Sequence, residues 1–212
     1  MSIQKSLEKN KSHMSVKMEN EKILKRFKET LLEIANQINI NSEMLDFDKI
    51  LKLVNLILRI KTENNKVFVY GAGRSGYIGR CFAQRLMHLD INSTFISDAT
   101  TPRYTKDDLL ILISGSGETT SPVAIAEKAR EIGGKVALFT TNIDSSIGKV
   151  SDIVIELKGK SKDAAVTKET LAPYTSLFDI STLSVLDAIG SVLMNLLNVT
   201  ENDIDKRHAS IE

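Results

Sequence analysis

The sequence predicts an α/β protein: a three-layer αβα sandwich around a five-stranded parallel sheet, with extra helices at the N-terminus. Two observations lead to this prediction. Between residues 66 and 157, short apolar runs alternate with segments of helical periodicity. The runs are continuously apolar, which is typical of strands buried on both faces. Strand–helix alternation with short connections therefore favours a parallel sheet with right-handed crossovers.

The N-terminal part is expected to contribute an extension and two helices. Residues 1–19 are polar and nearly free of large apolar side chains, so we expect a frayed extension there. From Glu19 onward, apolar residues recur at the three- and four-residue spacing of a helix face. They are Ile23, Leu24, Phe27, Leu31, Ile34, Ala35 and Ile38, and then Phe47, Ile50, Leu51, Val54, Ile57 and Ile60 in a second helix. The expected organisation is an extension over 1–19 followed by a single domain over 20–212.

The remaining elements follow from the same reading. The expected strands are "KVFVY", "STFIS", "DLLILIS", "KVALFT" and "DIVIEL". The expected helices are 75–89, 121–133, Leu177 to Leu197 and a short tail helix from Glu201 to His208. Thr200 is the expected N-cap of the tail helix. A polar connector, 158–173, separates the last strand from the long helix.

Composition excludes several classes of partner. The 28 Lys and Arg against 27 Asp and Glu give a net charge of +1, which offers no long-range attraction for nucleic acid or an anionic membrane. The single cysteine, Cys81, cannot form an internal disulfide, and we expect it to pack in the core. We find no run of ~18 apolar residues and no secretory signal. The expectation is a cytoplasmic protein without nucleic-acid or membrane partners.

A glycine-rich loop, Gly71-x-Gly73-x-x-Gly76, follows the first predicted strand directly. The pattern is that of a dinucleotide-binding loop, and Asp98 lies roughly 20 residues beyond it, where a ribose-binding acid is expected. A tight strand-to-helix turn, however, needs glycine whatever it binds. The glycine pattern alone leaves both interpretations open.

A second loop, "SGSGETTSP" from Ser114 to Pro122, favours a phosphate instead. Five hydroxyl side chains and two glycines follow the third predicted strand, and Ser121 with Pro122 predicts a helix N-cap and first turn. Hydroxyls, backbone N–H groups and a helix N-terminus together suit a dianionic phosphate, whereas a dinucleotide needs no such loop. An ordinary polar turn is the alternative. Because ligands bind beyond the carboxyl ends of parallel strands, we expect both loops to share one site.

Four segments together resemble the 6-phospho-3-hexuloisomerases of the sugar isomerase (SIS) domain family: "GAGRSGYIGRCFAQRLMHL", "TTPRYTKDDLLILISGSGETTS", "LFD…LD…VLM" and "VTENDIDKRHASIE". The resemblance covers about residues 46–212. It implies the five-stranded SIS fold and interconversion of D-arabino-hex-3-ulose 6-phosphate and D-fructose 6-phosphate, without a metal or an organic cofactor. It also implies a homotetramer and a place in the ribulose monophosphate pathway of formaldehyde fixation.

Isomerisation through a 2,3-enediol requires a phosphate anchor, a base and a group that moves oxygen protons. Arg74 would add charge at the phosphate or at an enediolate, with a surface salt bridge as its alternative role. The resemblance implies as anchor Ser75, Ser114, Ser116 and Thr119, with Gly73 and Gly117 allowing close approach of the backbone.

For the base, the family carries Phe-Glu near the start of the last long helix, and this chain has Phe178-Asp179. Asp179 is the expected base, although it is one methylene shorter and a displacement of ~1 Å can cost ~100-fold in rate. A plain first-turn acid that favours the helix dipole is the alternative. Glu118 and Glu169 are the rival bases.

His208 is the expected proton shuttle, because an imidazole titrates near neutrality. A histidine near a C-terminus is otherwise usually solvated; the "KRHASIE" resemblance implies the catalytic role, in which the histidine often comes from a neighbouring subunit. His88 is expected to end a helix as a structural residue. Two other functions stay open: an isomerase of another sugar phosphate, and a non-catalytic sugar-phosphate sensor that kept the anchor and lost the base.

Overall fold

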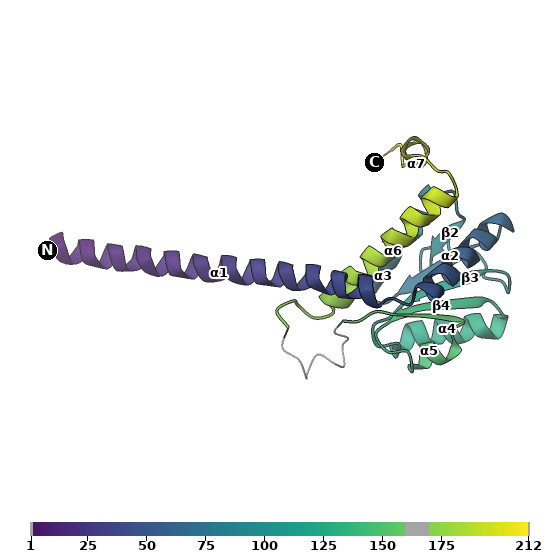
Figure 1. The fold of residues 1–212 in the computed structure, drawn as a ribbon, viewed down its shortest axis with the longest axis horizontal. Helices are drawn as coiled ribbons and strands as arrows, with labels where there is room; N and C mark the ends of the chain where they lie inside the picture. The colour runs from purple at the N-terminus through teal and green to yellow at the C-terminus, as the bar shows by residue number, and fades with distance from the viewer. Residues whose placement is uncertain (1, 160–169, 212) are drawn as a thin grey trace.

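The structure, a computed structural model, describes residues 2–159 and 170–211 and has a mixed α/β architecture (Figure 1). The helices are α1 (Ser2–Met44), α2 (Phe47–Thr62), α3 (Arg74–His88), α4 (Thr120–Ile132), α5 (Ser146–Val150), α6 (Ser176–Leu196) and α7 (Glu201–Arg207). The strands are β1 (Val67–Gly71), β2 (Ser93–Phe95), β3 (Leu109–Ile113), β4 (Lys135–Thr140) and β5 (Ile153–Glu156).

The five strands form one sheet in the order β2-β1-β3-β4-β5, and every neighbouring pair is parallel. The predicted five-stranded parallel sheet is therefore confirmed. In the register of the central pair, Gly71 at the end of β1 lies opposite Ile113 at the end of β3. This pairing places the glycine loop beside the hydroxyl loop.

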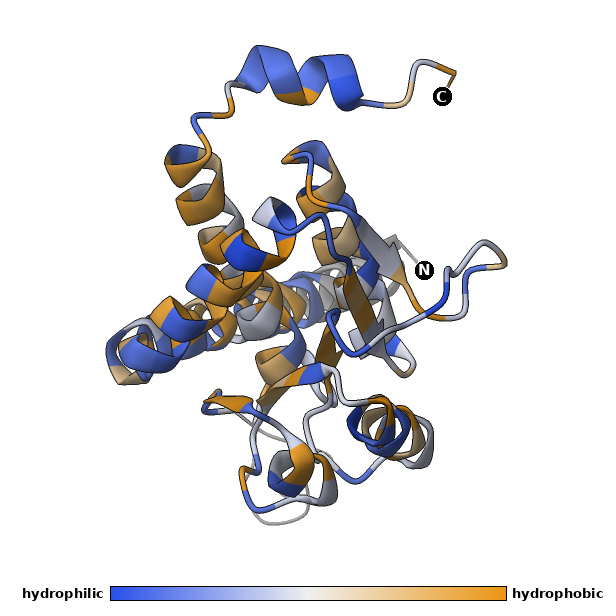
Figure 2. Ribbon diagram, turned by 90° about the vertical axis from the view of Figure 1, so that its right-hand side faces the viewer, coloured by the Kyte–Doolittle hydropathy of each residue, from blue (hydrophilic) through white to orange (hydrophobic). Residues whose placement is uncertain are grey.

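Helices cover both faces of the sheet and complete three layers. Val69 and Ile111 face one way, into a core formed with α2, α3 and α6. Phe68 and Leu112, their neighbours along the strands, face the other way and pack with α4 and α5. Figure 2 shows these apolar strands at the centre of the molecule. The strands read as continuous apolar runs because both faces are buried.

Helix α1 is the main difference from the sequence prediction. The expected frayed extension over 1–19 is instead part of one continuous helix from Ser2, which projects far from the sheet (Figure 1). These residues contain no glycine or proline, so nothing local ends a helix there. Closer to the body, the Glu33 carboxylate accepts bonds from the N–H groups of Leu171 and Ala172 at 2.9 and 2.7 Å. The division at residue 19 stays a prediction.

Helix α6 is long and apolar enough to cross a membrane by length and composition alone, contrary to the expectation that no such stretch exists. Half of this stretch is buried in the fold, where Leu186, Ile189 and Leu193 enter the core with α3. Its apolar character is accounted for in part by this packing.

The thiol of Cys81 is exposed on α3, so the prediction that it faces the core is wrong. The next two residues, Phe82 and Ala83, take the buried positions of this turn. His88 ends α3, as expected, and the structure shows that it is buried. Thr200 caps α7, because its side chain accepts a hydrogen bond from the N–H of Asp203.

Candidate active site

A cavity of about 320 Å³ lies at the carboxyl ends of β1 and β3. Three helices, α3, α4 and α6, begin at its rim, so the positive end of each helix dipole lies beside it. Among the described residues, the lining is Ala72, Gly73, Arg74, Ser75, Ile113, Ser114, Gly115, Ser116, Thr119, Pro122, Tyr174, Thr175 and Phe178. The structure thus gathers six of the predicted binding residues around one space, from Gly73 to Thr119.

The hydroxyl loop is held in shape by its own side chains. The Ser114 hydroxyl, almost fully buried, accepts a bond from the N–H of Gly117 at 3.2 Å. Gly117 has a φ of +68°, and a Cβ at that position would overlap the Ser145 hydroxyl. Gly117 therefore shapes the loop from behind and does not line the cavity, in contrast to the direct backbone approach that we expected.

The helix after this loop starts earlier than predicted. Thr119 is the N-cap of α4, and the prediction of Ser121 as N-cap is wrong. The Ser121 hydroxyl instead accepts a bond from the Tyr70 hydroxyl at 3.2 Å. Pro122 still lies in the first turn, where a missing N–H leaves no intrahelical bond unmade. The shift brings the Thr119 side chain to the cavity.

Asp179 lies directly behind the cavity wall. Its side chain is only 2% exposed, and its carboxylate accepts three hydrogen bonds. Arg74 Nε donates to Oδ2 at 2.9 Å, Ser75 Oγ donates to Oδ1 at 3.2 Å, and Thr175 Oγ1 donates to Oδ2 at 2.7 Å. All three donors line the cavity, whereas Asp179 itself lines a smaller hollow of about 190 Å³ on the far side of Arg74.

Thr175 and Tyr174 are site residues that the sequence analysis did not single out. Thr175 is the residue before α6 and has a left-handed backbone with a φ of +60°. Its hydroxyl faces Asp179, and Tyr174 forms the adjoining part of the lining. The signal that could have found Thr175 is its place next to a helix start at the carboxyl edge of the sheet.

The other candidate acids are engaged elsewhere or not described. Glu118 accepts a bond from the N–H of Ser146 at 2.8 Å, at the start of α5. Hydrogen bonds from the Ser146 side chain and backbone lower the pKa of Glu118, so it stays ionised. Asp98 pairs with Arg80 and does not line the cavity. Glu169, the third candidate base, lies outside the described residues.

His208 lies far from the cavity of its own chain. Its ring stacks on His88, with the two centroids 5.1 Å apart. His88 ends the fifteen-residue helix α3 and Arg74 begins it, so roughly 21 Å separates the stack from the cavity. Within one chain, the structure does not bring the two predicted catalytic residues, Asp179 and His208, together.

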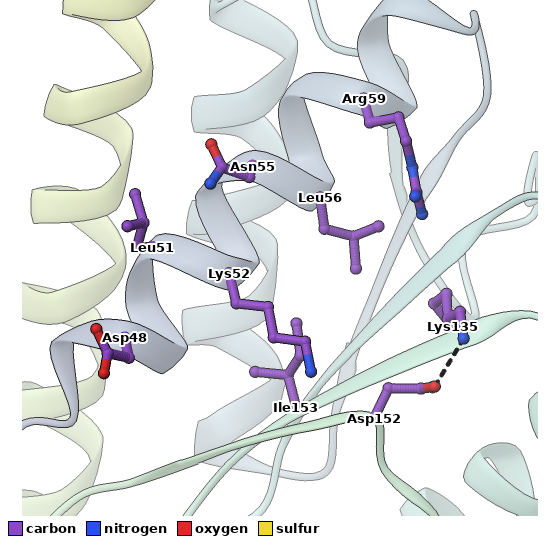
Figure 3. Close-up of a pocket in the computed structure, with 9 residues that line it drawn as sticks. All are labelled: Asp48, Leu51, Lys52, Asn55, Leu56, Arg59, Lys135, Asp152 and Ile153. Carbon is purple, nitrogen blue, oxygen red and sulfur yellow. Dashed lines mark hydrogen bonds and ion pairs between the residues drawn. The ribbon is translucent and has the colours of Figure 1, made fainter.

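A larger hollow of about 650 Å³ lies at the opposite edge of the sheet, between α2 and the starts of β4 and β5 (Figure 3). It contains none of the predicted site residues. Its Asp152 carboxylate is paired with Lys135 at 2.9 Å and also receives a bond from Arg130 at 3.0 Å. Three helix N-termini and the hydroxyl groups single out the smaller cavity as the candidate site.

The fold and the cavity define a class: an α/β protein whose pocket, lined by hydroxyls, an arginine and helix N-termini, suits a small molecule that carries a phosphate. In the described part of the chain, no group of three or more His, Cys, Asp or Glu is arranged to hold a metal ion. Residues 60–178 match the model of the SIS domain family, and the chain belongs to that family.

Several relatives are similar over most of the chain. A 3-hexulose-6-phosphate isomerase from Methanocaldococcus jannaschii is 42% identical over 160 residues, which cover 76% of this chain and 84% of the relative. Another, from Bacillus subtilis, is 35% identical and covers 87% and 98%. A solved Methanococcus jannaschii structure, which infers a 3-hexulose-6-phosphate isomerase function for its protein, superposes with a TM-score of 0.74 at 37% identity, over 84% of this chain and 97% of that one.

Proposed function

We propose that this protein is an isomerase that interconverts D-arabino-hex-3-ulose 6-phosphate and D-fructose 6-phosphate through a 2,3-enediol. The observation that carries the proposal is the cavity at the ends of β1 and β3, where hydroxyls, Arg74 and three helix N-termini converge. The similarity to relatives named 3-hexulose-6-phosphate isomerase, which extends through this region, supports the substrate. The same similarity supports a place in the ribulose monophosphate pathway, and we propose a cytoplasmic location.

The hydroxyl loop anchors the phosphate of the substrate. Ser116 and Thr119 are exposed or half-buried at the cavity and available to donate to phosphate oxygens, next to the free N–H groups at the start of α4. Ser75 lines the cavity from α3 as well, although its hydroxyl donates to Asp179 in the free protein. Binding energy from this remote group holds the reacting carbons in place. The Arg74 guanidinium, 62% exposed, is free to offer its terminal nitrogens to the enediolate that forms.

The reaction needs only proton transfers. A base takes the proton from C2 of the 3-ulose while O3 gains a proton, and the 2,3-enediol forms. O2 then loses its proton as C3 is protonated, which yields the 2-ulose. Among the described residues, no carboxylate or imidazole lines the cavity. We assign the proton transfers to His208 of the partner subunit, since His208 cannot reach the cavity of its own chain.

Exposed apolar side chains support a homotetramer. Ile23, Leu24, Phe27 and Leu31 are each more than half exposed on α1, and Val192 and Leu196 are exposed on α6. A helix that projects from its domain with such a face gains most of its stability from packing against another surface. Second copies of the chain would cover these faces, and the same association would carry α7 and His208 to a neighbouring cavity.

An assay of the purified protein with D-arabino-hex-3-ulose 6-phosphate tests the proposal. We expect formation of fructose 6-phosphate. Turnover of an aldose phosphate such as arabinose 5-phosphate, with none of the hexulose phosphate, would instead assign the protein to another sugar-phosphate isomerase. Binding of the hexulose phosphate without turnover would identify a sensor.

A further inference from the structure

We infer that Asp179 and Thr175 are positioning residues, which fix Arg74 and Ser75 at the cavity, and that Asp179 is not the base. This inference rests on the proposed function and assigns a role within it. Asp179 is the one described group that bonds simultaneously to the first turn of α3 and to the residue before α6. It therefore joins two sides of the cavity.

The burial of Asp179 supports this role. A base must present a free oxygen lone pair to the substrate, within about 3 Å of the proton that it takes. Asp179 is 1% exposed as a residue and is absent from the described cavity lining, whereas the three residues that donate to its carboxylate, Arg74, Ser75 and Thr175, do line the cavity. A buried carboxylate with several donors is held firmly, and it holds those donors firmly in return.

The backbone conformation of Thr175 independently supports the positioning role. A β-branched residue with a positive φ is an outlier that persists only where surrounding contacts impose it. The Thr175 side chain makes no capping bond to α6, since its hydroxyl donates to Asp179 Oδ2 at 2.7 Å. The left-handed conformation thus serves to aim this hydroxyl at the carboxylate, and strained positions of this kind are concentrated at functional sites.

The consequence for catalysis concerns Arg74. A guanidinium that is largely exposed would sample many orientations, but Asp179 fixes its Nε. Arg74 lines the cavity, and no described hydrogen bond engages its two terminal nitrogens, which leaves them available for the phosphate or the enediolate. Fixing the charge before substrate arrives removes the cost of ordering it during the reaction. Ser75, held through Oδ1, is oriented by the same carboxylate.

The test uses Thr175→Val, Thr175→Ser and Asp179→Asn in the full chain. Thr182→Val is the matched control, because it also removes a threonine hydroxyl that donates within the first turns of α6, to the Phe178 carbonyl, while Thr182 itself is not among the described residues that line the cavity. Thr175→Gly is added as a variant that relieves the positive φ, so loss of folding does not hide the effect. The readouts are kcat, KM, the pH profile of kcat/KM and affinity for inorganic phosphate.

We expect Thr175→Val and Thr175→Gly to lower kcat/KM by about 10- to 100-fold, as for one lost bond to a charged group. The affinity of these two variants for inorganic phosphate should fall as well. Thr175→Ser should retain most activity, and Thr182→Val should match wild type. Asp179→Asn should weaken phosphate affinity and keep the acid limb of the pH profile. If Asp179→Asn abolishes turnover and leaves phosphate affinity unchanged, Asp179 is the base and the inference is wrong. Unchanged kinetics in Thr175→Val and Thr175→Gly would also overturn it.

The phosphate measurement separates this inference from the proposed function. If wild type fails to isomerise the hexulose phosphate, the proposed function fails, while weakened phosphate binding in Thr175→Val still supports positioning. If wild type is active but Thr175→Val binds inorganic phosphate as tightly as wild type does, only the positioning role is rejected.

Discussion

The imidazole of His208 stacks on that of His88, with the ring centroids 5.1 Å apart. Beside this stack, Arg207 donates to the His88 carbonyl at 3.1 Å, so the end of α7 is fixed to the end of α3. Figure 2 shows α7 as a mostly hydrophilic helix that stands apart from the sheet. A tail fixed in this way presents His208 at the surface of the chain, in a place suited to a neighbouring subunit.

Mixed oligomers test whether His208 acts across subunits. His208→Ala should lose most activity, since the proton shuttle is missing, and so should an anchor double variant, Ser116→Ala with Thr119→Val. When the two are co-expressed, an oligomer that pairs an intact anchor with an intact His208 from its neighbour should recover part of the activity. Recovery is measured as kcat per subunit. If the mixed protein stays as inactive as its parents although heteromers form, His208 does not act in trans.

Ser116→Ala tests the phosphate anchor. Its hydroxyl lies at the cavity, and in the free protein it accepts a bond from the N–H of Glu118 at 3.2 Å. We expect substrate binding to weaken by ~1 kcal/mol or more, the value of a hydrogen bond to a charged group. Calorimetric titration with fructose 6-phosphate measures it, and Ser184→Ala on α6, outside the cavity lining, is the control. Equal affinities in both variants would remove Ser116 from the anchor.

Gly117→Ala should destabilise the protein more than Gly73→Ala. Both glycines have a positive φ, +68° and +58°, so the backbone is strained when alanine replaces either of them. Only at Gly117 does the new Cβ overlap the Ser145 side chain, whereas nothing lies within 4 Å at Gly73. We expect Gly117→Ala to lower the free energy of unfolding by about 3 kcal/mol or more. Denaturant unfolding gives both values, and equal losses would mean that the loop around Gly117 relaxes freely.

Asp152 should contribute folding stability that is lost at low pH. Burial acts to raise the pKa of Asp152, but the Val136 N–H and the Lys135 side chain outweigh it and leave the pKa below its ordinary value. A lowered pKa in the folded state contributes stability above about pH 4, where the unfolded carboxyl is ionised, and this contribution is lost as pH falls through the folded pKa.

We therefore expect Asp152→Asn to be less stable than wild type at pH 7 and to lose less stability between pH 7 and pH 3. Unfolding curves recorded across this range measure both effects. Asp107→Asn, at an exposed position, controls for the loss of one charge. Parallel curves for wild type and Asp152→Asn would show that this network does not contribute to the pH dependence.

The apolar face of α1 should be required for assembly. Phe27 is 68% exposed in the single chain, and Phe27→Glu places a charge in the middle of that face. We expect a smaller mass in sedimentation equilibrium and, because His208 is proposed to come from a partner, a parallel loss of activity. Lys28→Glu puts the same carboxylate about 100° around the helix and should leave the mass unchanged. A full-size oligomer in Phe27→Glu would show that this face is not an interface.

Local patterns determined most of the architecture. The continuous apolar runs specified the strands because each is buried on both faces, and the glycine and hydroxyl loops marked the carboxyl edge because tight turns and anion sites need those residues. The N-cap at Thr200 was predictable for a similar reason, since the capping bond is local. The start of α4 was not, because the Ser121 hydroxyl bonds to Tyr70, far away in sequence.

The sequence by itself thus determined the sheet and its helices, which follow from periodicity, and its two loops marked the edge of the sheet at which the cavity lies. Only the tertiary structure decided how Asp179 is used, where Thr175 points and how far His208 lies from its own cavity. The use of Asp179 and the place of His208 depend on contacts of α3 with α6 and with α7, more than 100 residues apart in the chain, and no local pattern encodes which donors a buried carboxylate will meet.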